Sequence, residues 1–328
     1  MLARYLRDYS PINLQEMRFP GFDEKREREI RRCVENVRDG HGTRKIERCP
    51  FCGSVERDVV FSRFEMNILQ CQACTLGYSE EFPIDTNDVY SDRDYLPIAI
   101  SDYQDNATYR KSRFGAERLS IIAQHLGRDQ QGARLLDVGC GTGWFLECAR
   151  AAGFDVSGLE LGSELAGFTS DRLGIEVWNQ TLDELPTDAL YDVITMFDVL
   201  EHVPDPKETL AHVFRLLNPG GIALFFVPNL ESLGFKVLKE NSSLCMPVEH
   251  LYYFTETALR PVLKQVGFQI VDFATRGMDI PDLYSYYRDI LDRPDAARLL
   301  EEMVSVLQPI IDGAGCGNHM RFVVRRPA

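Results

Sequence analysis

Two close pairs of cysteines have the spacing of metal ligands. Cys49 and Cys52 are separated by two residues, as are Cys71 and Cys74, and 18 residues lie between the pairs. Two such knuckles are typical of a tetrahedral zinc site with four thiolate ligands. Four thiolates leave no open coordination position, so we expect one structural Zn²⁺. It would hold together a zinc ribbon at 49–80, a segment too small to fold without a metal.

The stretch LLDVGCGTGWF at 135–145 has the pattern of a strand, a glycine-rich turn and the start of a helix. Gly139, Gly141 and Gly143 let the backbone turn sharply and let a ligand approach the chain closely. The dinucleotide pattern G-x-G-x-x-G fails here, because Trp144 follows where the third glycine would allow close packing of helix on strand. The loop therefore predicts a ligand site of another kind.

Strands alternate with helices of about 10–15 residues from residue 134 onward, which predicts a parallel sheet covered on both faces. The expected fold class is α/β, doubly wound around a mostly parallel sheet. Ligands of such sheets bind beyond the carboxyl ends of the strands. Glu160 ends the second strand, 17 residues after Gly143, where a carboxylate can accept hydrogen bonds from both hydroxyls of a ribose.

Four features in this order resemble class I S-adenosylmethionine-dependent methyltransferases. They are LLDVGCGTG, Glu160, YDVITMFDVLEHVPDP at 191–206 and LLNPGGIALFFVPN at 216–229. The similarity covers about residues 134–275. It implies a Rossmann-like sheet of seven strands, S-adenosylmethionine as the cofactor, and methyl transfer as the activity.

The resemblance implies a role for each matching residue. The three glycines would pass beneath the methionine part of the cofactor, Asp137 would orient its ammonium group, and Glu160 would hold the ribose. Thr181 and Leu182 match the segment that brackets the adenine, where backbone contacts are expected. Asp198 ends the fourth strand beside the expected methyl-transfer centre, and capping of the following turn is its alternative reading.

Glu249 and His250 stand in the stretch MPVEHLYYF at 246–254, after the fifth predicted strand. An imidazole with a pKa near 6.5 suits the removal of a proton at neutral pH. An adjacent carboxylate could hold its tautomer, although neighbours on a strand point to opposite sides. Sugar C-methyltransferases that this chain resembles carry an adjacent Glu-His in this region, with the histidine as the proposed base. The alternative is that His250 is a structural histidine that hydrogen-bonds to the backbone. This structural interpretation is the one favoured for His202.

The expected organisation has four parts. They are an N-terminal helical arm at 1–48, the zinc ribbon at 49–80, a connecting and cap segment at 81–133, and a methyltransferase domain at 134–328 with substrate-binding inserts at about 230–254 and 278–314. Within these parts we expect an amphipathic helix at 23–40, an irregular acidic segment at 81–106 and a helix at about 109–127.

A net charge of −14 over 328 residues argues against a nucleic-acid-binding surface. No apolar run reaches the length of a membrane span and no signal peptide is recognisable, so a cytoplasmic location is expected. The expected function is methyl transfer to a hydroxyl, or secondarily a carbon, of a sugar or specialised small metabolite. An RNA methyltransferase guided by the ribbon and a catalytically silent cofactor-binding scaffold are the alternatives. The apolar stripe of the helix at 23–40 leaves a homodimer open.

Overall fold

The computed structural model describes residues 12–18, 20–89, 92–186 and 188–328. The chain divides into two units. The first combines residues 1–89, 227–259 and 274–321, and the second combines residues 90–226, 260–273 and 322–328. The cysteine-rich segment and the stretches 230–254 and 278–314 therefore belong to the same unit, although they lie far apart in the sequence.

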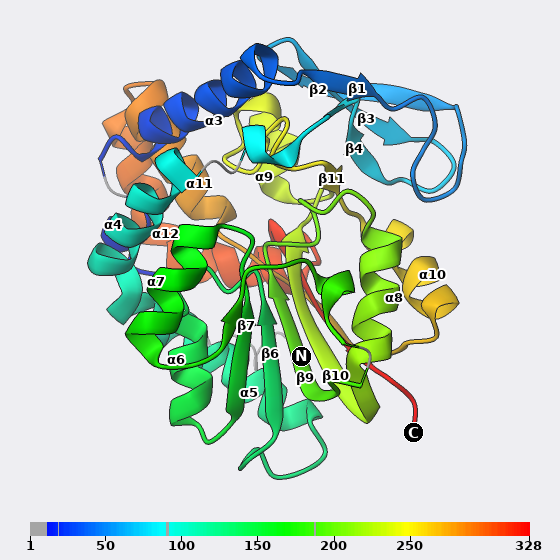
Figure 1. Cartoon of the computed structure of the whole chain (residues 1–328). Helices are drawn as coiled ribbons and strands as arrows, with labels where there is room; N and C mark the ends of the chain where they lie inside the picture. The colour runs from blue at the N-terminus through cyan, green and yellow to red at the C-terminus, as the bar shows by residue number, and fades with distance from the viewer. Residues whose placement is uncertain (1–11, 19, 90–91, 187) are drawn as a thin grey trace. The chain divides into compact units, whose positions relative to one another are not determined.

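A seven-stranded sheet forms the base of the second unit (Figure 1). Its order is β12-β13-β10-β9-β6-β7-β8, and the paired strands from β10 to β8 are parallel. The strands are β6 (Arg134–Val138), β7 (Asp155–Leu159), β8 (Val177–Trp178), β9 (Tyr191–Phe197), β10 (Leu217–Pro228), β12 (Gln269–Arg276) and β13 (His319–Arg325). The predicted doubly wound α/β fold is confirmed.

The last strand, β13, runs against β10. The amide of Gly220 donates to the carbonyl of Arg326 at one end, and the amide of Asn229 donates to the carbonyl of Asn318 at the other. Residue numbers thus rise along one strand as they fall along the other, which is the antiparallel arrangement.

Most helices of the sheet follow the predicted alternation. They are α5 (Ala116–His125), α6 (Trp144–Ala151), α7 (Ser163–Leu173), α8 (Pro206–Leu216) and α10 (Glu256–Val266), with a 3₁₀ turn η3 at Leu182–Glu184. Asp205 caps α8 by accepting from the amides of Lys207 and Glu208, and Thr255 precedes α10 with its hydroxyl accepting from the amide of Ala258. Among the described residues, no helix combines the length and the apolar character that a membrane span requires.

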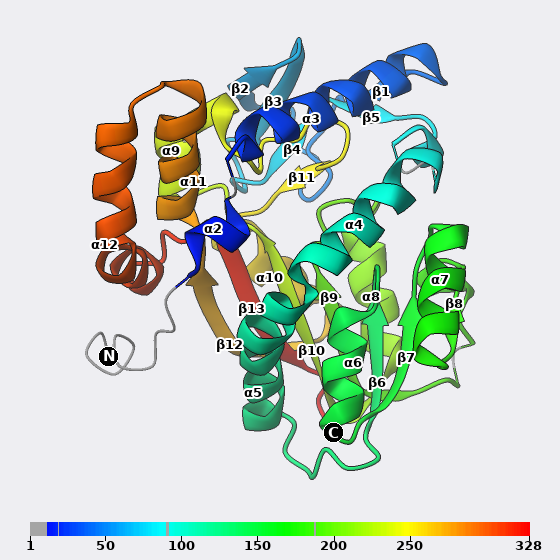
Figure 2. The same cartoon turned by 90° about the vertical axis from the view of Figure 1, so that its left-hand side faces the viewer.

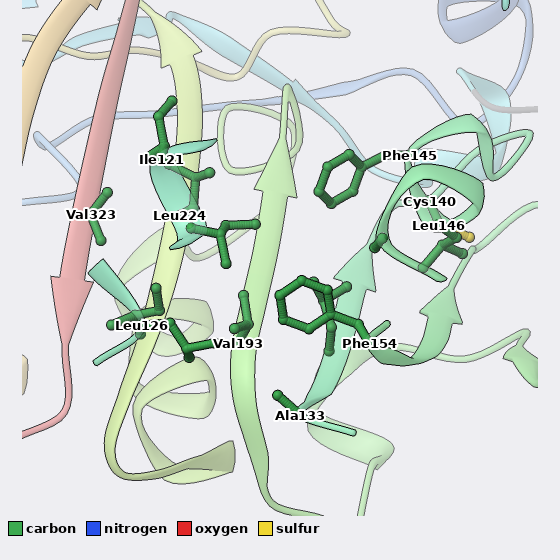
Figure 3. Close-up of a cluster of buried hydrophobic side chains, with 14 of the residues drawn as sticks. Ile121, Leu126, Ala133, Cys140, Phe145, Leu146, Phe154, Val193, Leu224 and Val323 are labelled. Carbon is green, nitrogen blue, oxygen red and sulfur yellow. The ribbon is translucent and has the colours of Figure 1, made fainter. Parts of the chain in front are cut away.

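The core of the second unit lies between the sheet and helices α5 and α6. Figure 3 shows Phe145 and Leu146 of α6 and Ile121 of α5 directed at strand residues that include Val193 and Leu224. The central strands are rich in Val, Ile, Leu and Phe because both of their faces are covered.

The segment at 81–106 was expected to be irregular, and this prediction is wrong from residue 92 onward, while residues 90 and 91 lie outside the described part of the chain. Residues Asp92–Arg110 form the helix α4, which a π-helical turn, η2 (Lys111–Gly115), joins to α5. The helix has no apolar face of helical period, so the sequence pattern did not reveal it. A polar cluster holds it instead, because Arg172 of α7 donates to the hydroxyl of Tyr103 at 2.7 Å.

The first unit contains the cysteine-rich ribbon and several helices (Figures 1 and 2). The ribbon sheet has the order β11-β4-β3-β2, and β1 pairs with β5 in a separate two-stranded sheet. The strands are β1 (Thr43–Lys45), β2 (Arg57–Arg63), β3 (Met66–Cys71), β4 (Gly77–Ser79), β5 (Glu81–Pro83) and β11 (Tyr252–Tyr253). The helices are α2 (Leu14–Met17), α3 (Phe22–Asp39), α9 (Leu233–Leu238), α11 (Asp279–Ser285) and α12 (Pro294–Gly313), with short turns η1 (Thr86–Asp88), η4 (Lys239–Asn241) and η5 (Tyr286–Ile290).

The helix predicted at 23–40 is confirmed as α3, which buries Ile30, Val34 and Val37. The inserts expected at about 230–254 and 278–314 contain helices, α9 in the first and α11 and α12 in the second.

Buried polar groups join the helices of the first unit to one another. The carboxylate of Asp279 is fully buried and accepts hydrogen bonds from the amides of Gly234 and Asn318 and from the amide side chain of Gln308. Arg18 forms a buried ion pair with Asp282. Burying charge is costly unless such partners are present, so these contacts fix how the helices of this unit pack.

Phe225 provides a test of the sheet core. Its side chain is fully buried in β10 and stacks on Phe322 of β13 with ring centroids 4.7 Å apart. We expect Phe225→Ala to lower the free energy of unfolding by about 3–5 kcal/mol, because it removes apolar contacts and leaves a cavity. Urea denaturation followed by circular dichroism measures the change.

The matched control is Leu161→Ala, since the Leu161 side chain is 60% exposed. That substitution should change stability by no more than about 0.5 kcal/mol. An equal loss in both variants would contradict the assignment of Phe225 to the core.

Candidate active site

The three glycines of the turn in the second unit have two different steric functions. All three glycines have left-handed φ values, of 69° at Gly139, 52° at Gly141 and 72° at Gly143. A Cβ at Gly139 would lie 2.5 Å from a methyl group of Val199, and one at Gly143 would lie 2.6 Å from Thr169. A Cβ at Gly141 would meet no atom within 4 Å. The outer glycines thus allow close packing, while Gly141 faces the open space that a ligand requires.

Glu160 lies directly after β7 and is held by the same turn. Its Oε2 accepts from the amide of Gly141 at 2.9 Å, and its Oε1 accepts from the amide of Gly162 at 3.0 Å. These two bonds orient the carboxylate, and an ionised carboxylate has about four acceptor positions. Side chains also support the turn, because Thr169 donates to the carbonyl of Gly141 and Arg172 donates to that of Thr142.

Asp137 lies in β6 and is 3% exposed. Its Oδ1 accepts a hydrogen bond of 2.6 Å from the hydroxyl of Thr195 on the neighbouring strand β9. Burial raises the pKa of Asp137 to about 7, against the opposing effects of the Thr195 hydrogen bond and the nearby charge of Arg118, while Glu160 adds to the rise. The carboxyl group is therefore poised to change charge near neutral pH.

Arg118 is a residue of this site that the sequence reading missed. The residue is 9% exposed, and its guanidinium lies over the rings of Phe197, at 3.7 Å from the centroid, and Trp144, at 4.7 Å. It donates no hydrogen bond to the residues that the structure describes, and burial lowers its pKa to about 10, opposed by the charges of Asp198 and Asp137. The sequence does place Arg118 on the same stripe of the predicted helix as Ile121 and Ile122, and a charge among apolar residues on one helix face indicates a buried, functional position.

The turn after β9 carries three ionisable residues. Asp198 adopts a left-handed φ of 57°, which is rare for a residue with a side chain and recurs at functional sites. Glu201 is fully buried, and neither of its oxygens accepts a hydrogen bond from the described part of the chain. Burial, reinforced by the charge of Asp198, raises its pKa well above the ordinary value. The amide of His202 donates to the carbonyl of Val199, and its Nε2 lies 3.9 Å from Glu201.

Thr181 and Leu182, the residues matched to the adenine segment, lie at the start of η3. Thr181 is exposed, and both its amide and its hydroxyl donate to the carboxylate of Glu184. Leu182 is 9% exposed. The capping interaction uses the amide of Thr181, so contact with a base at this position falls to other backbone groups or to Leu182.

The four cysteines converge in the first unit. The sulfur of Cys49 lies 3.5 Å from that of Cys74, and the sulfur of Cys52 lies 3.5 Å from that of Cys71. All four sulfur atoms lie within 4.8 Å of one another. A tetrahedral zinc ion with bonds of about 2.3 Å holds its thiolates about 3.8 Å apart, so the four residues fit a zinc ion.

His250 is 4% exposed and its ring is fixed by the backbone. Its Nδ1 lies 2.9 Å from the carbonyl oxygen of Leu244. A carbonyl can only accept, so Nδ1 carries the proton and Nε2 is the basic nitrogen of the neutral ring. The ring also meets Tyr253 edge-on, with centroids 5.9 Å apart.

Glu249 has a different neighbourhood from His250. Its carboxylate hydrogen-bonds to the thiol of Cys33 on α3, and burial raises its pKa against the opposing charge of Arg26. The tautomer of His250 is therefore fixed by the carbonyl of Leu244, while the carboxylate of Glu249 is engaged with α3.

Taken together, the second unit offers a glycine turn with open space at Gly141, an oriented carboxylate at Glu160, and buried charges at Asp137 and Arg118. This set fits S-adenosylmethionine, which carries a ribose, an ammonium group and a carboxylate. The first unit separately holds the four-cysteine site and His250.

Comparison with known proteins agrees with this geometry. Among curated proteins, the chain is 37% identical over 124 residues to the ubiquinone biosynthesis O-methyltransferase of Pectobacterium atrosepticum, covering 36% of this chain and 51% of that protein. It is 35% identical over 119 residues to the enzyme of the same name from Bordetella avium, covering 34% and 49%. The match thus spans about half the length of these relatives.

Among solved structures, the chain is similar to phosphoethanolamine N-methyltransferase 2 of Haemonchus contortus, determined in complex with S-adenosyl-L-methionine. The TM-score is 0.51 at 18% identity, over 77% of this chain and 63% of that one. This likeness concerns the fold. The family model described as a methyltransferase domain matches residues 109–272, which is half of the sequence. The chain therefore belongs to the methyltransferase domain family.

Proposed function

We propose that this protein transfers a methyl group from S-adenosylmethionine to a hydroxyl of a small metabolite, a sugar or a specialised product, with His250 as general base. The observation that carries the proposal is the arrangement of Gly141, Glu160 and Asp137 at the carboxyl ends of β6 and β7, in a chain of the methyltransferase domain family. The name O-methyltransferase of the two curated relatives supports oxygen as the acceptor.

The cofactor supplies an electrophilic methyl group on a positively charged sulfur. In the proposed binding mode, Glu160 accepts from the ribose hydroxyls, Asp137 faces the ammonium group and Arg118 faces the carboxylate of the methionine part. The aromatic rings around Arg118, including Phe197, favour a cation in their vicinity. At Gly141 the turn leaves room for the cofactor, because a Cβ there would meet no atom within 4 Å.

The acceptor must lose a proton as its oxygen bonds to the methyl carbon and the carbon–sulfur bond breaks. His250 is suited to take that proton, because its Nδ1–H is committed to the carbonyl of Leu244 and its Nε2 is basic. Glu249 contributes by anchoring the loop to Cys33. Its proposed role is thus positional and does not involve proton transfer.

The ribbon does not favour an RNA substrate. Of the two arginines in the hairpin between the cysteine pairs, Arg63 donates to the carbonyls of Ser242 and Cys245 and pairs with Glu27. Arg57 donates to the carbonyl of Glu47. Neighbouring acidic residues offset both charges, so the ribbon lacks the basic surface that phosphate recognition requires. A structural zinc ion in the ribbon is part of the proposal.

Removing the carboxylate of Glu160 should weaken cofactor binding. We expect Glu160→Ala to raise the Kd for S-adenosylmethionine by about 10- to 100-fold, because hydrogen bonds to a charged acceptor contribute about 1.5–3 kcal/mol. Isothermal titration calorimetry measures this. Glu164→Ala, at an exposed position of α7, is the matched control and should leave the Kd unchanged. Equal affinities in all three proteins would exclude Glu160 from the ribose site.

Cofactor affinity should depend on pH through Asp137. The pKa of this carboxyl is raised to about 7, so it is ionised above that value and neutral below it. The ammonium group of the cofactor keeps its charge up to about pH 7.5, so attraction to Asp137 should fall as the pH falls. We expect the Kd to rise roughly tenfold between pH 7.5 and pH 6.

The variant Asp137→Asn should bind more weakly and lose this pH dependence. A wild-type Kd that stays constant from pH 7.5 to pH 6 would show that Asp137 does not titrate against the cofactor.

Turnover should depend on His250. With methyl-labelled S-adenosylmethionine and a metabolite extract, mass spectrometry should find the label in a small hydroxylated product. We expect His250→Ala to lower kcat by about 10²- to 10⁴-fold while the cofactor Kd is unchanged, since general base catalysis contributes about that much.

His41→Ala, at an exposed histidine of the same unit, is the control and should retain full turnover. Label found in RNA instead of small molecules would overturn the proposed substrate class. Full activity of His250→Ala would remove it as the base.

A further inference from the structure

The His250 loop is built into the sheet of the zinc ribbon. Directly after His250 and Leu251, the strand β11 pairs antiparallel with β4, with Tyr252 opposite Tyr78 and Tyr253 opposite Gly77. The ribbon sheet therefore has four strands, of which three come from the cysteine-rich segment and one from a stretch about 170 residues later. The loop that carries the proposed base ends where this pairing begins.

Ser79 links the ribbon directly to the backbone of His250. Its hydroxyl donates to the carbonyl oxygen of His250 at 2.9 Å, and its amide donates to the carbonyl of Leu251 at 3.0 Å. Ser79 is fully buried, so its hydroxyl cannot be replaced by water without rearrangement. On the other side of the loop, the amide of His250 donates to the carbonyl of Met246. The backbone of His250 is thus held from both sides, and one of the two is the ribbon.

The approach of β11 to β4 is close enough to require glycine at position 77. A Cβ there would lie 2.7 Å from Leu230 and 2.9 Å from both the Cβ and the carbonyl oxygen of Tyr253. Next to it, the hydroxyls of Thr75 and Thr255 lie 2.6 Å apart. These contacts continue the pairing to within one residue of Cys74.

A metal knuckle itself packs on the loop. Phe51 stands between Cys49 and Cys52, and its ring stacks on Tyr252 at 6.3 Å and lies 6.0 Å from the ring of Phe254. Tyr252 and Phe254 are almost completely buried. Any change in the backbone of the knuckle moves the ring that covers β11, since buried aromatic side chains leave little free volume.

We propose that the ribbon acts as the positioning element of the acceptor side of the reaction, with Phe51 and Ser79 as the residues that transmit metal binding to His250. Zinc bound by the four cysteines fixes the knuckle, the knuckle fixes β4 and β11, and β11 fixes the backbone of His250. The catalytic consequence rests on the function proposed above, whereas the coupling between ribbon and loop does not.

Hydrogen–deuterium exchange of the full-length protein tests the coupling directly. We expect removal of zinc by a chelator to speed exchange in peptides covering 244–254 by about tenfold or more, and re-addition of Zn²⁺ to restore protection. Peptides covering the glycine turn at 134–147 serve as the internal reference and should keep their exchange rates.

Two variants that keep all four cysteines test the coupling between the ribbon and the His250 loop even if the metal-free protein unfolds. Phe51→Ala and Ser79→Ala should retain one zinc per chain and an unchanged Kd for S-adenosylmethionine, yet show faster exchange at 244–254 and a kcat lowered by about tenfold or more. Ser62→Ala is the matched control, because Ser62 lies exposed on the opposite edge strand β2 and should affect none of these quantities.

Unchanged exchange at 244–254 in both variants would overturn the positioning role, whatever their activity. That result is distinct from failure of the proposed base, which is measured by His250→Ala. A fully active His250→Ala variant with faster exchange in Phe51→Ala would keep the coupling and reject the base. An inactive His250→Ala variant together with unchanged exchange in Phe51→Ala and Ser79→Ala would keep His250 as the base and reject the coupling.

Discussion

The backbone hydrogen bonds between β4 and β11 join two segments that are about 170 residues apart in the sequence. Several features of the ribbon follow from this pairing. Gly77 must lack a side chain, Ser79 must be buried, and the rings of Phe51, Tyr252 and Phe254 must stack in the space that remains. A sheet strand contributed from a distance makes the ribbon part of one cooperative structure with the stretch that follows β10.

The regular part of the molecule could be predicted from the sequence. The strands and helices of residues 134–275 could be predicted from mainly apolar strands, glycine turns and capping residues, because both faces of a parallel sheet are covered and its central strands are rich in apolar residues. The cysteine spacing likewise predicts a cluster, and the four sulfur atoms do converge. Patterns of this kind can be recognised in a single sequence because they depend only on residues that are close to one another along the chain.

What could not be predicted depends on contacts between distant residues. The helix α4 has no apolar stripe and is held by polar contacts such as that between Tyr103 and Arg172, so its segment resembles a loop. Arg118 shares a helix stripe with Ile121 and Ile122, but the four aromatic rings that surround it come from distant parts of the sequence. The stretch at 252–253 is only two residues long as a strand, and its partner cannot be found by periodicity. Glu249 and His250 are adjacent in sequence, but their side chains contact different residues, and these contacts cannot be deduced from the sequence pattern.

The four-stranded ribbon sheet also limits how this chain can be divided. A fragment starting after residue 80 would lack β2, β3 and β4 and would leave Tyr252, Tyr253 and Phe254 without the surface that covers them. Those aromatic residues would then form an open strand edge, which favours pairing with other chains and aggregation. The ribbon is therefore not an interchangeable module at the start of the chain, and natural or engineered exchanges of it must bring a matching β11.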